Sequence, residues 1–172
     1  MAAKQEAKEK KPKLHWWAAV GYDFKSDITF YSTPGNDNGK LSHRVYIDQI
    51  LEPIVLPWLE HGDDFVLEED GDSGHGYNPT GSANIVTKWK EEHRLKTYKN
   101  CPDTPEFSPV ENAWHWPKKR LREVPHWDEE TMKELVLEGW ESLKQETINK
   151  WVNEMPERLQ KCIDLDGRRP VY

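Results

Sequence analysis

A proline-rich loop leads directly into an amphipathic helix at Thr104-Pro105-Glu106-Phe107-Ser108-Pro109-Val110-Glu111-Asn112-Ala113-Trp114. A proline disfavours helical backbone in the residue before it, so the stretch predicts loop up to Ser108 and helix from Pro109 onward. Apolar residues recur at helical spacing beyond it and predict a face that packs on a core. The carboxylate of Glu111 stands in the first turn, beside a row of cations. That pattern suits either a metal ion facing a polyanion or an ordinary solvated surface.

Strand signals come before this helix. Aromatic and β-branched residues at 15–22 and 27–32 predict a hairpin joined by a short polar link. Residues 65–69 predict a short buried strand, and residues 95–98 predict another. Glycines at 71–81 predict a loop after the first of these two short strands.

Helix signals alternate with these strands and dominate the second half of the chain. Ser42, Ser82 and Asp128 are placed to cap helices, because each precedes an apolar pattern of helical period. Prolines are expected to kink or break the helical stretches in which they lie, at Pro53, Pro57 and Pro156. Strands that alternate with helices and give way to helices predict one α/β layer domain.

Composition narrows the class of protein. A chain of 172 residues suits a single domain, and the Lys/Glu-rich residues 1–14 predict a disordered tail. No apolar run has the length of a membrane span and no signal-peptide pattern is present, so we expect no membrane partner and an intracellular location. The net charge of −7 argues against strong non-specific affinity for DNA.

Three segments resemble one protein family in the same order along the chain. Residues 104–114 resemble the S-P-D-x-N-P-I-E-N-x-W signature of Tc/mariner-type DDE transposases. Residues 65–75 look like the family's strand that ends in Q-D-N-x-P-x-H, and residues 148–159 are similar to its terminal I-N-x-L-V-x-S-M-P-x-R. The resemblance covers residues 15–172, with departures from the second motif at Glu69, Gly71 and Ser73.

The resemblance implies a fold and a set of site residues. It implies the three-layer ribonuclease-H-like fold of the integrase and transposase superfamily, here lacking its first strand. Asp70 and Glu111 match catalytic carboxylates that bind Mg²⁺ or Mn²⁺, and DNA is the implied substrate and partner. We expect contacts with nucleic acid from the motif histidine and from the basic residues after Glu111, namely His75, Lys118, Lys119 and Arg122.

The family's first catalytic Asp has no counterpart, because no Asp precedes Asp23 in this sequence. The resemblance therefore implies that the chain begins inside the domain, after the strand that carries this Asp. Asp23 and Asp27 are the nearest replacements, but we expect both in the link between the first two strands. Without its middle strand, the sheet has two unpaired edges, which favour self-association.

Other interpretations remain open at this point. A calcium loop starting at Asp70 fails, since the EF-hand pattern needs a Glu where Gly81 stands. The function classes are a DDE endonuclease that cuts and joins DNA, a non-catalytic module derived from it that binds DNA or protein, and a gene remnant. We favour a transposase-derived domain with an incomplete catalytic set, located in the nucleus or cytoplasm. We find no helix-turn-helix motif in this sequence, so we do not expect it to recognise a specific DNA sequence.

Overall fold

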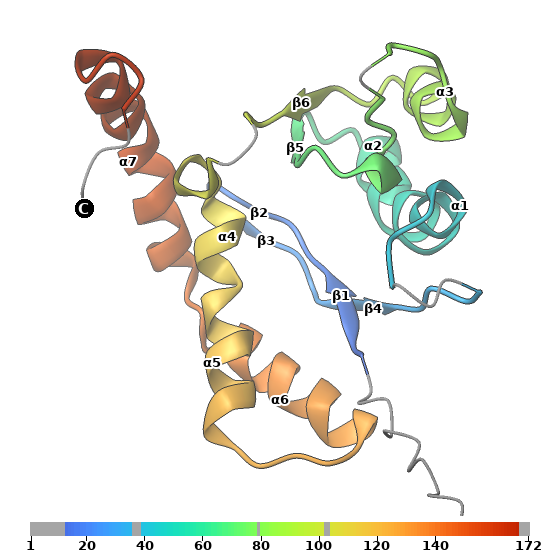
Figure 1. Ribbon diagram of the computed structural model, residues 1–172, viewed down its shortest axis with the longest axis vertical. Helices are drawn as coiled ribbons and strands as arrows, with labels where there is room; N and C mark the ends of the chain where they lie inside the picture. Colours follow the sequence, from blue (N-terminus) through green and yellow to red (C-terminus); the bar gives the residue numbers. More distant parts are fainter. Residues whose placement is uncertain (1–12, 36–38, 79, 102–103, 169–172) are drawn as a thin grey trace, which may run out of the picture.

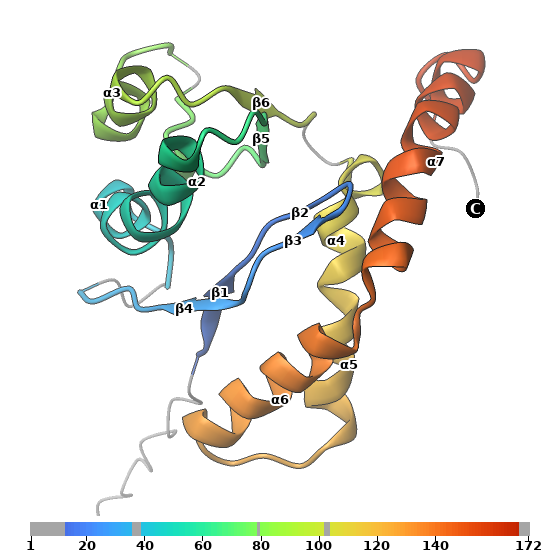
Figure 2. The same ribbon diagram turned by 180° about the vertical axis from the view of Figure 1, so that it is seen from behind.

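The computed structural model describes residues 13–35, 39–78, 80–101 and 104–168. Nearly all of the predicted tail lies outside these ranges. The described residues form a mixed α/β structure, in which helices lie on both sides of a central β-ribbon (Figures 1 and 2).

The ribbon is the predicted hairpin. β1 (His15–Trp17) pairs antiparallel with β4 (Thr29–Tyr31), and β2 (Val20–Gly21) pairs antiparallel with β3 (Phe24–Lys25). The chain turns at Asp23, whose φ of 51° is accessible to a short polar side chain. The prediction of a hairpin is confirmed, and its turn lies between β2 and β3.

The first helical layer begins with an uninterrupted run of three helical segments. α1 (His43–Tyr46), the π-helical η1 (Ile47–Val55) and α2 (Leu56–His61) follow one another directly, and Ser42 caps α1 as predicted. The expected break at Pro53 and Pro57 is wrong. The wider turn of a π-helix accommodates Pro53, while Pro57 lies in the first turn of α2, where proline is tolerated.

A small parallel sheet and one more helix complete this layer. β5 (Leu67–Glu69) pairs with β6 (Thr97–Lys99), close to the two predicted strands. The 3₁₀ turn η2 (Ser73–His75) follows β5. Helix α3 (Ile85–Glu92) is capped by Asn84 in a capping box with Thr87, not by Ser82, since only the Asn84 side chain accepts from the first backbone N–H groups of this helix.

The second helical layer contains the loop and helix quoted at the start of the sequence. A 3₁₀ turn, η3 (Pro105–Phe107), precedes α4 (Pro109–Ala113) and α5 (His115–Glu123), as the prolines predicted. Asp128 caps α6 (Glu129–Ser142). α7 (Gln145–Asp164) runs through Pro156 without interruption, contrary to the prediction. Ile148, Trp151 and Val152 of its first half pack with α4 and α6, and beyond the proline Arg158 donates to the C=O of Glu106 at 3.3 Å.

Two hydrophobic cores lie on opposite faces of the ribbon. Trp17 faces the first core, which is built from the run of helices that starts at α1 together with α3, β5 and Leu95, which precedes β6. Ala18 faces the second, where it packs with residues of α4, α6 and α7. Neighbouring strand residues point to opposite faces, so the ribbon acts as the middle layer.

Candidate functional site

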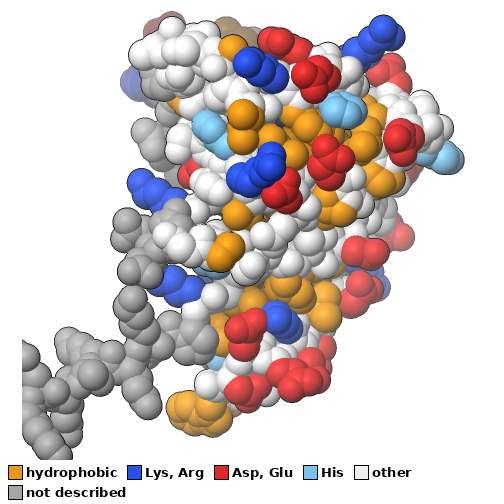
Figure 3. Space-filling view, turned by 90° about the vertical axis from the view of Figure 1, so that its right-hand side faces the viewer, with side chains coloured by type: hydrophobic (Ala, Val, Ile, Leu, Met, Phe, Trp, Pro, Cys, Tyr) orange, Lys and Arg blue, Asp and Glu red, His pale blue; other side chains and the backbone are white. Residues whose placement is uncertain are grey.

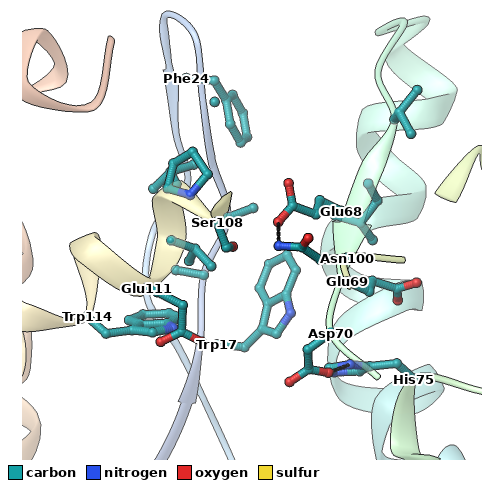
Figure 4. Close-up of a pocket in the computed structure, with 18 of the residues that line it drawn as sticks. Trp17, Phe24, Glu68, Glu69, Asp70, His75, Asn100, Ser108, Glu111 and Trp114 are labelled. Atoms are coloured by element: carbon teal, nitrogen blue, oxygen red, sulfur yellow. Dashed lines mark hydrogen bonds and ion pairs between the residues drawn. The ribbon is translucent and has the colours of Figure 1, made fainter. Parts of the chain in front are cut away.

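A cleft of about 1200 Å³ separates the ribbon from β5. Its lining comes from the β1–β2 side of the ribbon, from residues 63–71 and from the start of α4. Four of the residues singled out in the sequence line it, namely Asp70, His75, Glu111 and Lys118. Figure 4 shows Asp70 and Glu111 on its two sides with Trp17 between them. The structure thus brings both predicted carboxylates to one cleft.

Asp70 lies directly after β5 and is oriented by its own loop. Its Oδ1 accepts a hydrogen bond from the backbone N–H of Asp72 at 3.0 Å and lies 2.7 Å from Nδ1 of His75. The hydrogen bond with His75 lowers the pKa of Asp70 below the usual value for this carboxyl group. Asp70 is therefore an ionised carboxylate at neutral pH, and His75 positions it.

Glu111 lies in the first turn of α4, because Pro109 starts that helix. Its side chain is exposed and faces the cleft from the side opposite Asp70 (Figure 4). A carboxylate is favourable at this end of a helix, where the dipole is positive. Glu111 therefore presents an exposed carboxylate to the cleft from the first turn of α4.

A third acidic side chain, Glu68, crosses toward α4 at the far end of the cleft. It accepts a hydrogen bond from Nδ2 of Asn100 at 3.1 Å and another from Ser108, the residue before α4. Partial burial raises the pKa of Glu68, and these two hydrogen bonds oppose the rise. No motif singles out Glu68, although a residue two positions before Asp70 in extended backbone is expected on the same face.

Behind Asp70, a buried polar network fixes the end of β5. Lys90 of α3 forms an ion pair with Glu69, and both side chains are at most 10% exposed. Tyr46 donates to Glu69 at 2.6 Å, and its ring lies 4.7 Å from the ring of His75. Burial, and then the charge of Glu69, raise the pKa of Tyr46 well above its usual value. The network fixes Glu69, which precedes Asp70 in the chain, and His75, which contacts the Asp70 carboxylate.

The predicted basic residues are only partly brought to the cleft. Lys118 lines it, whereas Lys119 lies 3.7 Å from Glu123 in an exposed ion pair, and Arg122 is exposed outside the cleft lining. Acidic and basic side chains are interspersed on the face turned to the viewer in Figure 3. This mixture, with a net charge of −7, supplies little general attraction for a polyanion.

Neither nearby aspartate completes the carboxylate pair. Asp23 and Asp27 do not line the cleft. Asp23 instead binds Asn149 of α7, with its N–H donating at 2.8 Å and its Oδ1 accepting at 2.6 Å. Asp23 lies between β2 and β3, and Asp27 lies between β3 and β4, so both lie in the link as expected.

Two carboxylates are too few protein ligands for a pair of divalent ions. Across the described residues, no three His, Cys, Asp or Glu side chains gather as a metal site. Mg²⁺ needs six oxygen ligands, of which Asp70 and Glu111 can supply only a few, with water supplying the rest. The chain therefore does not fit the pair of ions that the resemblance implies.

Comparisons with known proteins add no relative. No protein-family model matches the chain, and no curated protein matches it. No helix among the described residues combines the length and hydropathy needed to cross a bilayer.

Proposed function

We propose that the chain is a transposase-derived domain of the DDE endonuclease type that does not cleave DNA on its own. One observation carries the proposal: Asp70 and Glu111, which come from two separate family-like motifs, line the same cleft. They lie 41 positions apart in the sequence, one after a strand and one opening a helix.

The arrangement of elements supports a ribonuclease-H-like fold as part of the same proposal. An antiparallel ribbon, a parallel strand pair and helices on both sides are the parts expected of that fold. The cleft lies between β1 and β5, which is the place expected for the first strand of the family's fold. The fold and the carboxylate pair thus support the same interpretation.

Charge explains why this domain is proposed to be inactive. Two divalent ions 4 Å apart repel each other by roughly 17 kcal/mol at an effective dielectric constant near 20. A shared carboxylate normally offsets part of this repulsion. Asp70 and Glu111 provide two negative charges against four positive ones, and neither Asp23 nor Asp27 reaches the cleft. The two-ion arrangement is therefore not expected to form.

Cleavage of supercoiled plasmid tests this proposal. The purified chain is incubated with plasmid and about 5–10 mM Mg²⁺ or Mn²⁺, a concentration above the dissociation constant of a weak ion site. We expect no nicked or linear DNA above background. The variants Asp70→Asn and Glu111→Gln serve as matched controls for a contaminating nuclease. Nicking by the wild-type chain that disappears in both variants would show that the domain is active and the proposal wrong.

A further inference from the structure

Two strand edges face the same cleft without a neighbour. In the described residues, β1 pairs only with β4, and β5 pairs only with β6. The cleft is lined by the free side of β1–β2 and by the free side of β5. Figures 1 and 2 show the ribbon and the β5–β6 pair as separate from each other. Unpaired edges of this kind are the sites at which proteins add a strand from another chain.

On the ribbon side, hydrogen bonds show which backbone groups point into the cleft. The N–H of Ala19 donates to Oγ of Ser26 at 2.8 Å, and its C=O accepts from the N–H of Ser26 at 2.9 Å. Backbone groups of successive residues in an extended strand point to opposite edges. Ala18 lies between β1 and β2 and lines the cleft, and we infer from this alternation that its N–H and C=O point away from Ser26.

On the β5 side of the cleft, the backbone groups of Glu68 point into the cleft. The N–H of Leu67 donates to the C=O of Lys96 at 2.9 Å, and the C=O of Glu69 accepts from Asn100 at 3.1 Å. Leu67 and Glu69 therefore direct their backbone groups toward β6. The N–H and C=O of Glu68, which lies between them, point to the opposite edge and into the cleft. A row of donors and acceptors thus lies on each side of one space.

The length and chemistry of the cleft define what fits it. Residues 65–71 all line it, and seven extended residues span about 23 Å. Aromatic and aliphatic side chains of Trp17, Phe24, Val66 and Trp114 form much of the lining. Exposed acidic side chains of the lining outnumber its single lysine, Lys118; they are Asp63, Asp64, Glu68, Asp70 and Glu111, of which Asp64 is paired with Lys96. An apolar strand with a basic end complements this surface, whereas the Lys/Glu-rich residues 1–12 have no alternating apolar pattern.

We propose that the cleft binds an extended, basic peptide segment of a partner protein as an inserted β-strand. The segment hydrogen-bonds Ala18 on one side and Glu68 on the other, joining the ribbon and the β5–β6 pair into one sheet. Its apolar side chains contact the lining and its Lys or Arg lies near Asp70 and Glu111. This interaction needs neither metal nor DNA, so it stands independently of the proposed function.

A designed peptide tests the proposal. The probe has eight residues, alternating Val and Thr between a Lys at each end, with both termini blocked. At saturating peptide, amide hydrogen exchange measured by NMR is expected to slow at least tenfold at Ala18 and Glu68 together. The same peptide with Glu in place of Lys is expected to bind at least fivefold more weakly at low salt, and a version N-methylated at alternate residues is expected not to bind.

Two proline variants give a matched pair on the protein. Glu68→Pro removes an N–H that points into the cleft, and Thr97→Pro removes one that points to the outer edge of β6, so both keep the β5–β6 hydrogen bonds. Peptide binding is expected to be lost in the first variant and kept in the second, with equal melting temperatures. Val66→Pro, which alters the same edge, replaces Glu68→Pro if that variant does not fold.

Three results would overturn the proposal. The first is wild-type protein in which the peptide protects neither amide, or only one of them. The second is binding that survives in both Glu68→Pro and Val66→Pro. The third is protection of Ala18 and Glu68 without peptide at high protein concentration, together with a dimer in sedimentation equilibrium, because a second copy of the chain would then be the occupant.

Discussion

Replacing Lys90 with methionine is expected to lower the free energy of unfolding by about 3–5 kcal/mol. Lys90 and Glu69 form a buried ion pair, and Nζ of Lys90 also donates to the C=O of His75 at 2.8 Å. Methionine has a similar length and no charge, so it leaves the Glu69 carboxylate buried with only Tyr46 as a partner. Urea denaturation of wild type and Lys90→Met measures the difference.

The control for this prediction is a lysine in an exposed pair. Lys96 pairs with Asp64 at 2.8 Å, with side chains 64% and 86% exposed, so Lys96→Met is expected to cost less than about 1 kcal/mol. The double variant Lys90→Met with Glu69→Gln is expected to recover part of the loss, because it removes the uncompensated charge. Equal losses for Lys90→Met and Lys96→Met would contradict the buried network.

Replacing Trp140 with alanine is expected to cost about 3–5 kcal/mol as well. Its ring is 1% exposed in the second core and stacks on Trp114 with centroids 5.6 Å apart. Its Nε1 donates to the C=O of Ser26 at 2.9 Å, which ties α6 to the ribbon. The alanine variant loses the packing and leaves that carbonyl without its donor. Thermal and urea denaturation measure the loss.

Trp127 provides a matched substitution of the same size. It is 88% exposed, so Trp127→Ala is expected to change the free energy of unfolding by no more than about 0.5 kcal/mol. A loss in Trp140→Ala no larger than in Trp127→Ala would show that α6 does not pack on the ribbon as described.

Local signals predicted the elements well wherever a single side chain decides the backbone. Ser42 and Asp128 cap helices as expected, because each side chain accepts from an N–H three residues on. Pro53 and Pro156 misled the prediction, since each removes one N–H donor without ending the helix in which it lies, and only Pro53 is flanked by buried residues. A rule that considers one residue at a time counts the lost N–H donor and leaves out the contacts made by the rest of the helix.

The site was predictable only where a motif marked it. Asp70, His75 and Glu111, which the motifs singled out, line one cleft, whereas Lys119 and Arg122 lie outside its lining. The buried partners of the site could not be predicted. Lys90 and Glu69 are 21 positions apart, and their sequence surroundings are those of ordinary surface residues. Their pairing depends on how α3 packs beside β5, which no local pattern specifies.

The convergence of Asp70 and Glu111 on one cleft is the central claim, and Mn²⁺ tests it most directly as a paramagnetic probe. In NMR spectra of the wild-type chain, added Mn²⁺ is expected to broaden the amide signals of Asp70 and Glu111 together. In Glu111→Gln, and likewise in Asp70→Asn, broadening at both positions is expected to fall sharply at the same Mn²⁺ concentration. Broadening at Asp70 that is the same in wild type and Glu111→Gln would mean that the two carboxylates share no ion, and would contradict the account.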